Sequence, residues 1–262
     1  MKNFSNSMYE KYKATNKKSI AIYLALRLLV IVSMVFQLIL GNISNVFMCM
    51  LALVLFTLPT IISEKFKIGI PSLLEAIIYL FIYSTAILGE INNFYGILPF
   101  WDTMLHTLNG FLCAGIGFSL VDLLNQNSKQ IKLSPLYVAI VAFCFSMTVG
   151  VLWEFLEFSA DKFVKTDMQK DRIITEISSV LLNANKENMP VRVKDIIKTQ
   201  IYSKDGSVMT IENGYLDIGL IDTMKDLLVN FLGAVVFSII GFLYIQNREK
   251  YKFAEGFIPK KE

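Results

Sequence analysis

Three apolar stretches of this chain carry an ionisable or amide side chain every three or four residues. They are Asp102 and His106 in WDTMLHTLNG, Glu154, Glu157 and Asp161 in WEFLEFSAD, and Asp222, Asp226 and Asn230 in DTMKDLLVNFLGA. A spacing of three or four residues places each set along one face of a helix. Ionisable groups inside membrane spans are costly, and they usually face a bundle interior or a wet cavity. The three sets therefore predict one shared polar site.

Helical rise allows the depth of these side chains to be compared, because each residue advances the helix by about 1.5 Å. His106, Glu154 and Asp226 fall at a similar depth, and Asp102, Glu157 and Asp222 lie nearer the same membrane surface. We expect His106, Glu154, Glu157 and Asp226 to be the catalytic candidates. The remaining members of the polar site are Asp102, Asp161, Asp217 and Asn230.

Three kinds of chemistry are open to such a site. Carboxylates and one imidazole suit a divalent ion such as Zn²⁺, Mn²⁺ or Mg²⁺, with His106, Glu154, Asp222 and Asp226 as the candidate ligands. Crowded carboxylates also raise one another's pKa, which suits metal-free acid–base catalysis. The third alternative is a structural polar network that ties helices together. The chain has neither HExxH nor CxxC, so the spacing names no metal.

The composition places the chain among membrane proteins. Hydrophobic residues make up 54% of 262 residues, and the mean hydropathy is +0.52. This is too apolar for an ordinary soluble domain. The net charge of +3 is too small to indicate a nucleic-acid partner. The three cysteines, Cys49, Cys113 and Cys144, fall in apolar runs and form no disulfide or metal pattern.

Runs of about 20 apolar residues predict transmembrane helices. Six such runs lie at 20–40, 44–63, 68–89, 102–123, 134–158 and 219–246. The predicted fold is therefore an all-α integral membrane bundle. Residues 1–161 hold the first five spans and an N-terminal tail, 162–218 form an insert, and 219–262 hold the last span and a C-terminal tail.

Lysines and arginines indicate the orientation, because they accumulate on the cytoplasmic side. In the tails and short loops they occur in four segments: Lys2, Lys11, Lys13, Lys17 and Lys18; Lys65 and Lys67; Lys129 and Lys132; and Arg248, Lys250, Lys252, Lys260 and Lys261. The segment 162–218 also carries many charges, of both signs and nearly balanced, but long loops cross the membrane largely regardless of charge. The loops at 41–44 and 90–101 contain none. Both termini are therefore expected in the cytoplasm, and the polar site is expected to face outward.

The insert at 162–218 is expected to be a small extracytoplasmic α/β segment. Ile173, Ile174, Ile177, Val180 and Leu181 recur with a helical period, which predicts an amphipathic helix over 170–184. The sequence KTQIYSKDGSVMTIENG has β-branched residues on both sides of Lys-Asp-Gly and predicts a hairpin. A loosely ordered loop is the alternative.

Two further features of the spans carry structural predictions. Arg27 and Glu75 lie at similar depth in spans one and three, and we expect them to form an ion pair. Small residues lie close to the polar sets, including Gly110, Ser146, Gly150 and Gly233. Small side chains allow neighbouring helices to approach closely.

The three polar elements resemble the bacterial YjdF-like inner-membrane proteins. FWDTMLHTLNGF, GVLWEFLEF and LDIGLIDTMKDLLVNFLGA occur in the order of that family's motifs, and the matching positions are Asp102, His106, Glu154, Glu157, Asp217, Asp222, Asp226 and Gly233. VanZ-like proteins show a looser version. The resemblance implies a polytopic protein of the bacterial inner membrane. This chain departs from it in having the long insert and in lacking an expected Arg-Glu pair after the fourth span.

The leading hypothesis is an outward-facing site that binds or acts on an envelope or lipid-linked molecule, with a divalent metal as the candidate cofactor. Whether it is an enzyme is left open by the residues. A proton- or cation-coupled carrier is the second alternative, and a non-catalytic envelope protein is the third. The lipid bilayer is the expected surrounding, and the sequence does not predict an oligomeric state.

Overall fold

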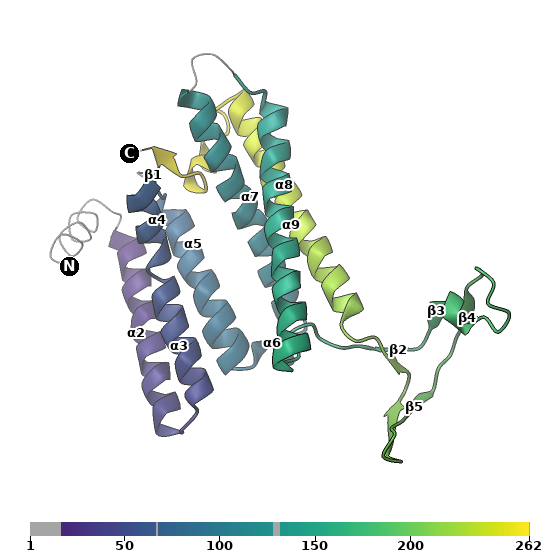
Figure 1. Ribbon diagram of the computed structural model, residues 1–262. Coiled ribbons are helices and arrows are strands. Elements are labelled where there is room, and N and C mark those ends of the chain that lie inside the picture. Colours follow the sequence, from purple (N-terminus) through teal and green to yellow (C-terminus); the bar gives the residue numbers. More distant parts are fainter. Residues whose placement is uncertain (1–16, 67, 128–131, 262) are drawn as a thin grey trace. The chain divides into compact units, whose positions relative to one another are not determined.

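The computed structural model describes residues 17–66, 68–127 and 132–261 and is mostly helical (Figure 1). Contacts between Cα atoms divide the chain into two compact units. The first unit is Met1–Gly150 together with Val229–Glu262, and the second is Val151–Leu228. The lysines expected in the N-terminal tail at positions 2, 11 and 13, and those at 67 and 129, lie outside the described residues.

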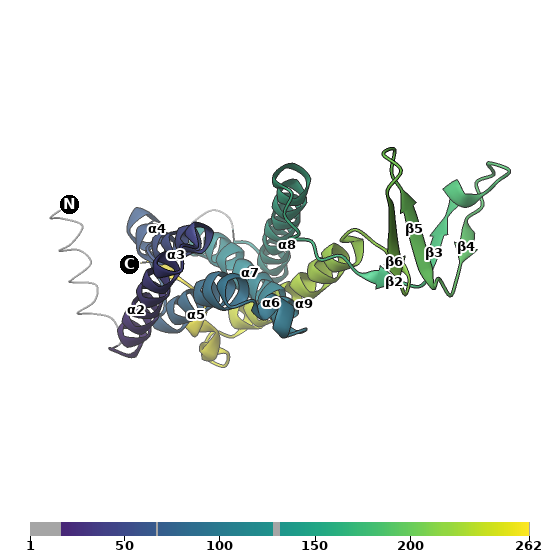
Figure 2. The ribbon, with the colours of Figure 1, turned by 90° about the horizontal axis from the view of Figure 1, so that it is seen from below.

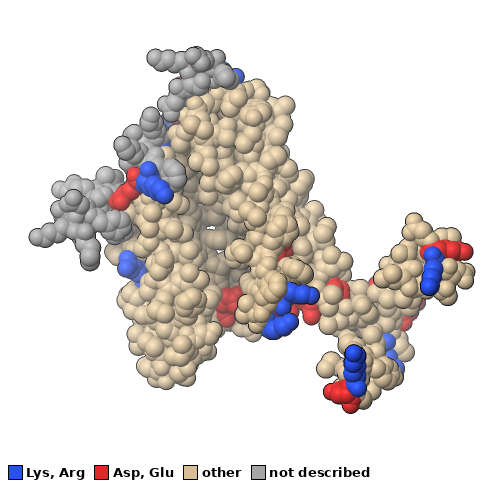
Figure 3. Space-filling model, viewed as in Figure 1, with Lys and Arg blue, Asp and Glu red and all other residues tan. Residues whose placement is uncertain are grey.

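Among the described residues, six helical segments are long and apolar enough to span a membrane. They are Ile20–Ile39, Ile43–Lys65, Ser72–Ile91, Trp101–Gln126, Pro135–Val164 and Leu220–Gln246. Each coincides with one predicted span, so the expectation of an all-α membrane protein with six spans is confirmed. Among the described residues on the face that Figure 3 shows, broad helical surfaces carry no charged atoms, as contact with lipid requires.

One core of the first unit joins α2 (Lys17–Ile39), α3 (Ile43–Leu55) and α5 (Ser72–Tyr83), which lie side by side in Figures 1 and 2. The rings of Tyr23 and Tyr79 are 4.9 Å apart at its centre, and Phe56 meets Tyr79 edge-on at 5.6 Å. Arg27 donates to the Tyr23 hydroxyl, and the Tyr79 hydroxyl donates to Glu75 at 3.0 Å. Each of the two charges that we expected to pair thus bonds to a tyrosine of this core, and a direct Arg27–Glu75 pair stays a prediction.

Short elements complete this part of the unit. They are α4 (Leu58–Phe66), the π-helical η1 (Ser84–Ile91), which continues α5, and α6 (Phe94–Ile97). Gly41 ends α2 with a φ of 72°, a left-handed conformation that glycine adopts without strain. The side chain of Asn42 then caps α3 by accepting from the Asn45 N–H at 3.2 Å.

A second core lies among three long helices, α7 (Trp101–Asn127), α8 (Pro135–Ser159) and α9 (Leu220–Gln246). Ala114, Phe118, Ala234 and Phe237 are fully buried there. Pro135 occupies the first position of α8, where its missing N–H is not needed. The first turns of α7 and α9 carry polar residues, Asp102 and Asp222, which are described below.

The C-terminal segment folds back onto the helices of the first unit. Ala254 in η4 (Lys252–Gly256) and Ile258 are buried in the second core. Strand β8 (Lys260–Lys261) then pairs antiparallel with β1 (Ile68–Gly69) between spans two and three. The loop between these two spans and the C-terminal tail therefore lie at the same end of the first unit.

The second unit contains the ends of α8 and α9 and a β-rich insert. The π-helical η2 (Ala160–Val164) ends span five. The strands that follow are β2 (Ile173–Ile174), β3 (Ile177–Ser179), β4 (Val191–Val193), β5 (Lys198–Tyr202), β6 (Val208–Glu212) and β7 (Tyr215–Leu216). They form the antiparallel pairs β2–β7, β3–β4 and β5–β6; Figure 2 shows β5 and β6 as a hairpin.

The insert confirms one prediction and corrects another. The predicted hairpin forms, with Lys198 opposite Glu212 and Tyr202 opposite Val208. The helix expected over 170–184 is wrong, because this stretch holds β2, β3 and only one turn of 3₁₀ helix, η3 (Val180–Leu182). Ile173 pairs with Leu216 and Ile177 with Val193, so the spaced apolar residues serve separate strand pairs.

Candidate functional site

The first two turns of α7 position Asp102 and His106. The Trp101 N–H bonds to the Leu98 carbonyl at 2.9 Å as the helix begins, and its ring packs edge-on against Phe94. Asp102 in the first turn is favoured by the partial positive charge of a helix N-terminus. Its Oδ1 lies 3.4 Å from Nε2 of His106, one turn further on. The two side chains are 26% and 12% exposed, so the pair remains accessible.

Below this pair, α7 and α9 touch along their backbones. A Cβ at Gly110 would lie 2.1 Å from the Asn230 carbonyl oxygen, and one at Gly233 would lie 2.0 Å from the Thr107 carbonyl oxygen. Asn109 also donates to the Asn230 side chain at 3.2 Å. The predicted close approach at these small residues is confirmed, and it fixes the register of α9 against α7.

The Ser146 hydroxyl of α8 joins the same contact. It donates to the Gly110 carbonyl at 2.7 Å, and both groups are buried. Asn230 is 1% exposed and completes its bonding with Asn109 and the sulfur of Met147. These polar groups stabilise the packing of the first unit, which is one of the roles foreseen for Asn230.

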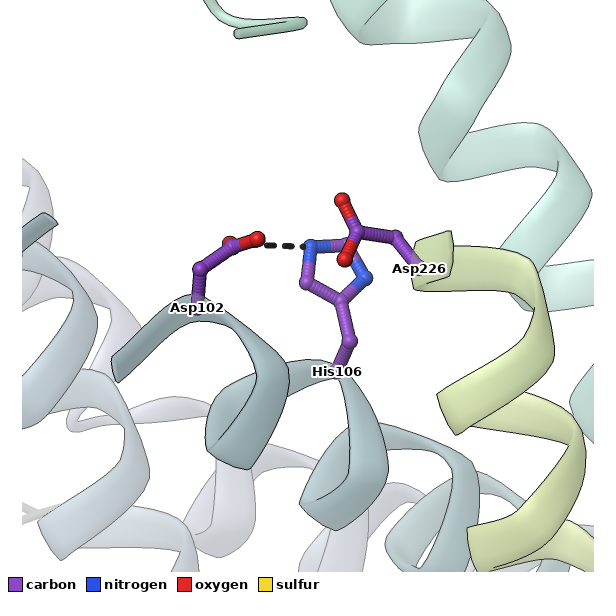
Figure 4. A group of neighbouring side chains, drawn as sticks. All are labelled: Asp102, His106 and Asp226. Carbon is purple, nitrogen blue, oxygen red and sulfur yellow. Dashed lines mark ion pairs between the residues drawn. The ribbon is translucent and has the colours of Figure 1, made fainter. Parts of the chain in front are cut away.

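Asp226 lies one helical turn before Asn230 in the unbroken helix α9. It is 2% exposed. One ligand atom each from Asp102, His106 and Asp226 lies within 4.8 Å of the others (Figure 4). Two carboxylates and an imidazole at this spacing can hold a divalent cation, and the imidazole and carboxylate chemistry suits Zn²⁺ or Mn²⁺.

Glu154 and Glu157 of α8 are both buried, but neither belongs to the group that meets this distance among the described residues. The indole N–H of Trp153 donates to Glu157 Oε1 at 2.8 Å. The grouping therefore contains His106 and Asp226, as foreseen, with Asp102 rather than Glu154 as the third member. The roles expected for Glu154 and Glu157 stay predictions.

The other predicted carboxylates bind backbone N–H groups of the second unit. Asp161 accepts from Met168 and Gln169 at 2.7 and 2.8 Å. Asp217 accepts from Arg172 at 2.7 Å and from Ile221 in the first turn of α9 at 3.0 Å. Burial raises the pKa of Asp217, but its bonds from the N–H groups of Arg172, Ile221 and Gly219 outweigh that effect and hold the pKa below 3.8.

Asp222, an expected metal ligand, is bonded to the same segment. Its Oδ2 accepts from the Lys170 N–H at 2.9 Å, and its Oδ1 lies 3.2 Å from the Arg172 guanidinium. Gln169 donates to Thr223, the next residue of α9. Residues 169–172 are thus bound to the first turn of this helix.

One ion pair of a buried carboxylate with a partly exposed arginine was not foreseen from the sequence. Arg248, just after span six, contacts both carboxylate oxygens of Asp122 in α7 at 2.8 and 3.0 Å. Gln126 donates to the same carboxylate at 2.7 Å. Asp122 was the signal that could have revealed the pair, because a carboxylate inside a predicted span needs a partner.

Comparison with known proteins shows the family of the chain. The family model described as "Predicted membrane protein (DUF2238)" matches residues 22–247. The chain belongs to this family. DUF2238 is the YjdF-like family, so the resemblance found in the three polar elements is confirmed. The looser VanZ-like resemblance is not shown by these comparisons.

A relative of this DUF2238 protein is an uncharacterised protein of Thermotoga maritima. The two are 31% identical over 83 residues, which is 32% of this chain. The match spans 41% of that relative's length. No solved structure matches the chain.

Proposed function

We propose that Asp102, His106 and Asp226 bind a divalent metal ion, and that the protein is a membrane-embedded metal-dependent enzyme for an envelope or lipid-linked molecule. The observation that carries the proposal is the placement of three ligand atoms within 4.8 Å of one another. Two residues come from α7 and one from α9, so the ligand set depends on folding.

The chemistry of the donors supports a metal. Asp226 is 2% exposed, and a carboxylate removed from water is stable when it is paired or coordinates a cation. Asp102 and Asp226 would supply hard oxygen ligands and His106 a nitrogen ligand, a mixture that suits Zn²⁺ or Mn²⁺. The contact of Gly110 with Asn230 keeps α7 and α9 in register and so supports the positions of the ligands.

Three protein ligands leave coordination positions open to water and substrate, as in catalytic metal sites. A bound divalent ion would supply Lewis acidity and a water that ionises near neutral pH. Asp102 Oδ1 lies 3.4 Å from Nε2 of His106, so the two side chains could reach the same ion. Buried Glu154 remains the candidate acid or base on α8.

The position of the ligands supports a substrate that approaches from a membrane surface. Asp102 and His106 occupy the first two turns of the span Trp101–Gln126, which places them about 2–8 Å along the helix from its beginning. This depth is within reach of a lipid headgroup. The lysines and arginines of the tails and short loops support an outward surface here, in a bacterial inner membrane with both termini in the cytoplasm. The pairing of β1 with β8 at one end is consistent with that orientation.

The aromatic core favours an enzyme or a binding protein over a carrier. Past the contact between α7 and α9, Phe237 packs edge-on against Phe111 at 5.0 Å and against Phe118 at 5.9 Å. These rings lie in the core between the helices, where a carrier would need a polar path. A carrier also has to expose its site to both sides of the membrane.

Metal analysis of the purified protein tests the proposal. The full chain is stripped with a chelator and titrated with Zn²⁺ and Mn²⁺, alongside Asp226→Ala and His106→Gln. Asp205→Asn is the control, since Asp205 lies in the β5–β6 turn. We expect a saturable site in the wild type and the control, with affinity reduced by about tenfold or more in the two variants. A wild type without a titratable metal, or an Asp226→Ala variant that binds equally well, would overturn the proposal.

A further inference from the structure

The guanidinium of Arg172 lies at the first turn of α9, the helix that carries Asp226. Its Nη2 is 3.2 Å from Asp222 Oδ1. Asp222 and Asp226 are four residues apart and hence neighbours on one helix face, with their Cβ atoms about 6 Å apart. Arg172 is thereby placed about one helical turn from a proposed metal ligand.

The protein holds Arg172 in this position through its backbone as well. Its N–H donates to Asp217 at 2.7 Å, and the N–H of Lys170 donates to Asp222 at 2.9 Å. The adjacent side chain of Gln169 donates to Thr223. An ordinary surface arginine loses side-chain entropy when a ligand orders it. The side chain of Arg172 is already partly ordered by Asp222, so less side-chain entropy is lost when a ligand binds.

Arg172 also has donors left for a ligand. A guanidinium carries five N–H donors in a planar fork, and the contact with Asp222 uses one edge of it. The Arg172 side chain is 44% exposed, whereas Asp222 is 5% exposed. Asp222 therefore anchors the group while part of it faces outward, in the way that suits bidentate recognition of an oxyanion.

The N-terminus of α9 adds to the attraction for an anion. This helix is 27 residues long, and the partial positive charge of its dipole lies at the turn that Arg172 contacts. The carboxylates near this turn would repel an anion by themselves. A divalent ion held through Asp226 would reverse that balance, and phosphate oxygens are ligands for both a divalent ion and an arginine.

We propose that Arg172 and the metal site together bind a phosphate group, so that the ligand is a phosphorylated molecule. The inference rests on the proposed metal site for its second contact. Arg172 is a binding residue in this scheme, whereas Asp222 and Asp217 position it.

Binding assays on the full chain in detergent test this assignment. Each protein is titrated with Mn²⁺ alone, and then, with Mn²⁺ bound, with inorganic phosphate, dihexanoyl phosphatidate or dihexanoylglycerol. The variants are Arg172→Gln and Arg172→Lys, and Arg192→Gln is the matched control because Arg192 pairs with Glu176 elsewhere in the insert. Thermal melting of every variant reports whether it is folded.

We expect phosphatidate to bind and dihexanoylglycerol not to bind. Arg172→Gln should weaken phosphatidate binding about tenfold or more, Arg172→Lys less, and Arg192→Gln not at all. The Mn²⁺ affinity should stay within about twofold in all three. Inorganic phosphate that binds as tightly as phosphatidate would assign a free phosphate as the ligand; weaker binding would assign a lipid headgroup.

The two proposals fail in different ways. Mn²⁺ binding without any phosphate binding, or phosphate binding that Arg172→Gln leaves unchanged, would overturn the role of Arg172 and leave the metal site standing. Phosphatidate binding that needs Arg172 but persists without Mn²⁺ would overturn the joint binding of phosphate by Arg172 and the metal, whereas the titration with Mn²⁺ alone decides whether the metal site exists. If neither Mn²⁺ nor phosphatidate binds, both the metal site and the phosphate site are overturned.

Discussion

Gly233 lies directly against the backbone of Thr107, where an added Cβ would come within 2.0 Å of the carbonyl oxygen. Backbone atoms cannot rotate away as a side chain can, so a methyl group there must push α9 away from α7. The contact also holds Asp226 in its relation to His106, since α9 is one unbroken helix. Packing and the proposed metal site therefore depend on the same glycine.

Substitution of Gly233 by alanine should destabilise the protein by about 1–3 kcal/mol, the usual range for overpacking. The effect is measured by heating the protein in detergent and determining, by size-exclusion chromatography, the fraction that remains folded at each temperature. Gly256→Ala is the control, because its Cβ would meet only the flexible Leu73 side chain at 3.1 Å. An equal loss in both variants would contradict the role assigned to the backbone contact.

The pair of buried Asp122 and partly exposed Arg248 should show strong coupling. Arg248→Gln leaves the Asp122 carboxylate, 2% exposed, without its guanidinium. We expect a loss of about 2–3 kcal/mol, below the value for a fully buried pair because Arg248 is partly exposed. In an Asp122→Asn background the same substitution should have a much smaller effect. A double-mutant cycle of unfolding free energies checks this, and additive losses would count against the pair.

Asp217 should make the insert sensitive to acid. Its folded-state pKa lies below 3.8 because three backbone N–H bonds outweigh its burial. The stabilisation is therefore complete above the unfolded-state pKa and is lost as pH falls through the lower folded-state value. Hydrogen exchange of the backbone N–H groups of Arg172 and Ile221, which bond to Asp217, measures this stabilisation. Asp217→Asn should reduce protection at neutral pH, with a difference from the wild type that disappears in strong acid.

Asp171 should behave in the opposite sense. Burial, and then the negative charges of Asp167, Asp217 and Asp161, raise its pKa above 3.8. A raised folded-state pKa means that the ionised form is disfavoured, so Asp171 destabilises the insert at pH values above its folded-state pKa. Asp171→Asn should slow proteolytic cleavage of residues 165–175 at neutral pH. Faster cleavage of this variant would contradict the sign.

The C-terminal segment should contribute to stability through Ile258. This side chain is 3% exposed in the second core, so Ile258→Asn buries an amide in an apolar setting and should lose about 2–4 kcal/mol. Phe253→Asn is a suitable comparison, since Phe253 is 59% exposed in the same segment. Melting temperatures distinguish them; similar values would mean that the segment does not pack as described.

The spans could be predicted because a bilayer demands about 20 apolar residues in sequence. Part of the site could be predicted as well, since helical spacing and depth place His106 and Asp226 at one level. Whether Asp102 joins the group of candidate metal ligands depends on how α7 is rotated about its own axis, and the spacing of residues along the chain does not determine that rotation. The pairing of Asp122 with Arg248 depends likewise on how the chain turns after α9.

The insert was harder to predict for a different reason. Ile173, Ile177 and Leu181 satisfy a helical period, but strands of two or three residues leave too few positions for alternation to show. Their partners, Leu216 and Val193, lie far along the chain. The β5–β6 hairpin was predictable because its strands are local and its turn contains Gly206 with a φ of 86°.

The pairing of β1 with β8 has a consequence for biosynthesis. Ile68 leaves the ribosome long before Lys261, its partner in the ladder. The ladder therefore forms only after span six and β8 have been made, and the first three spans enter the bilayer before this contact exists. Folding at this end of the protein is thus post-insertional, because it joins a loop made early to a strand made about 190 residues later.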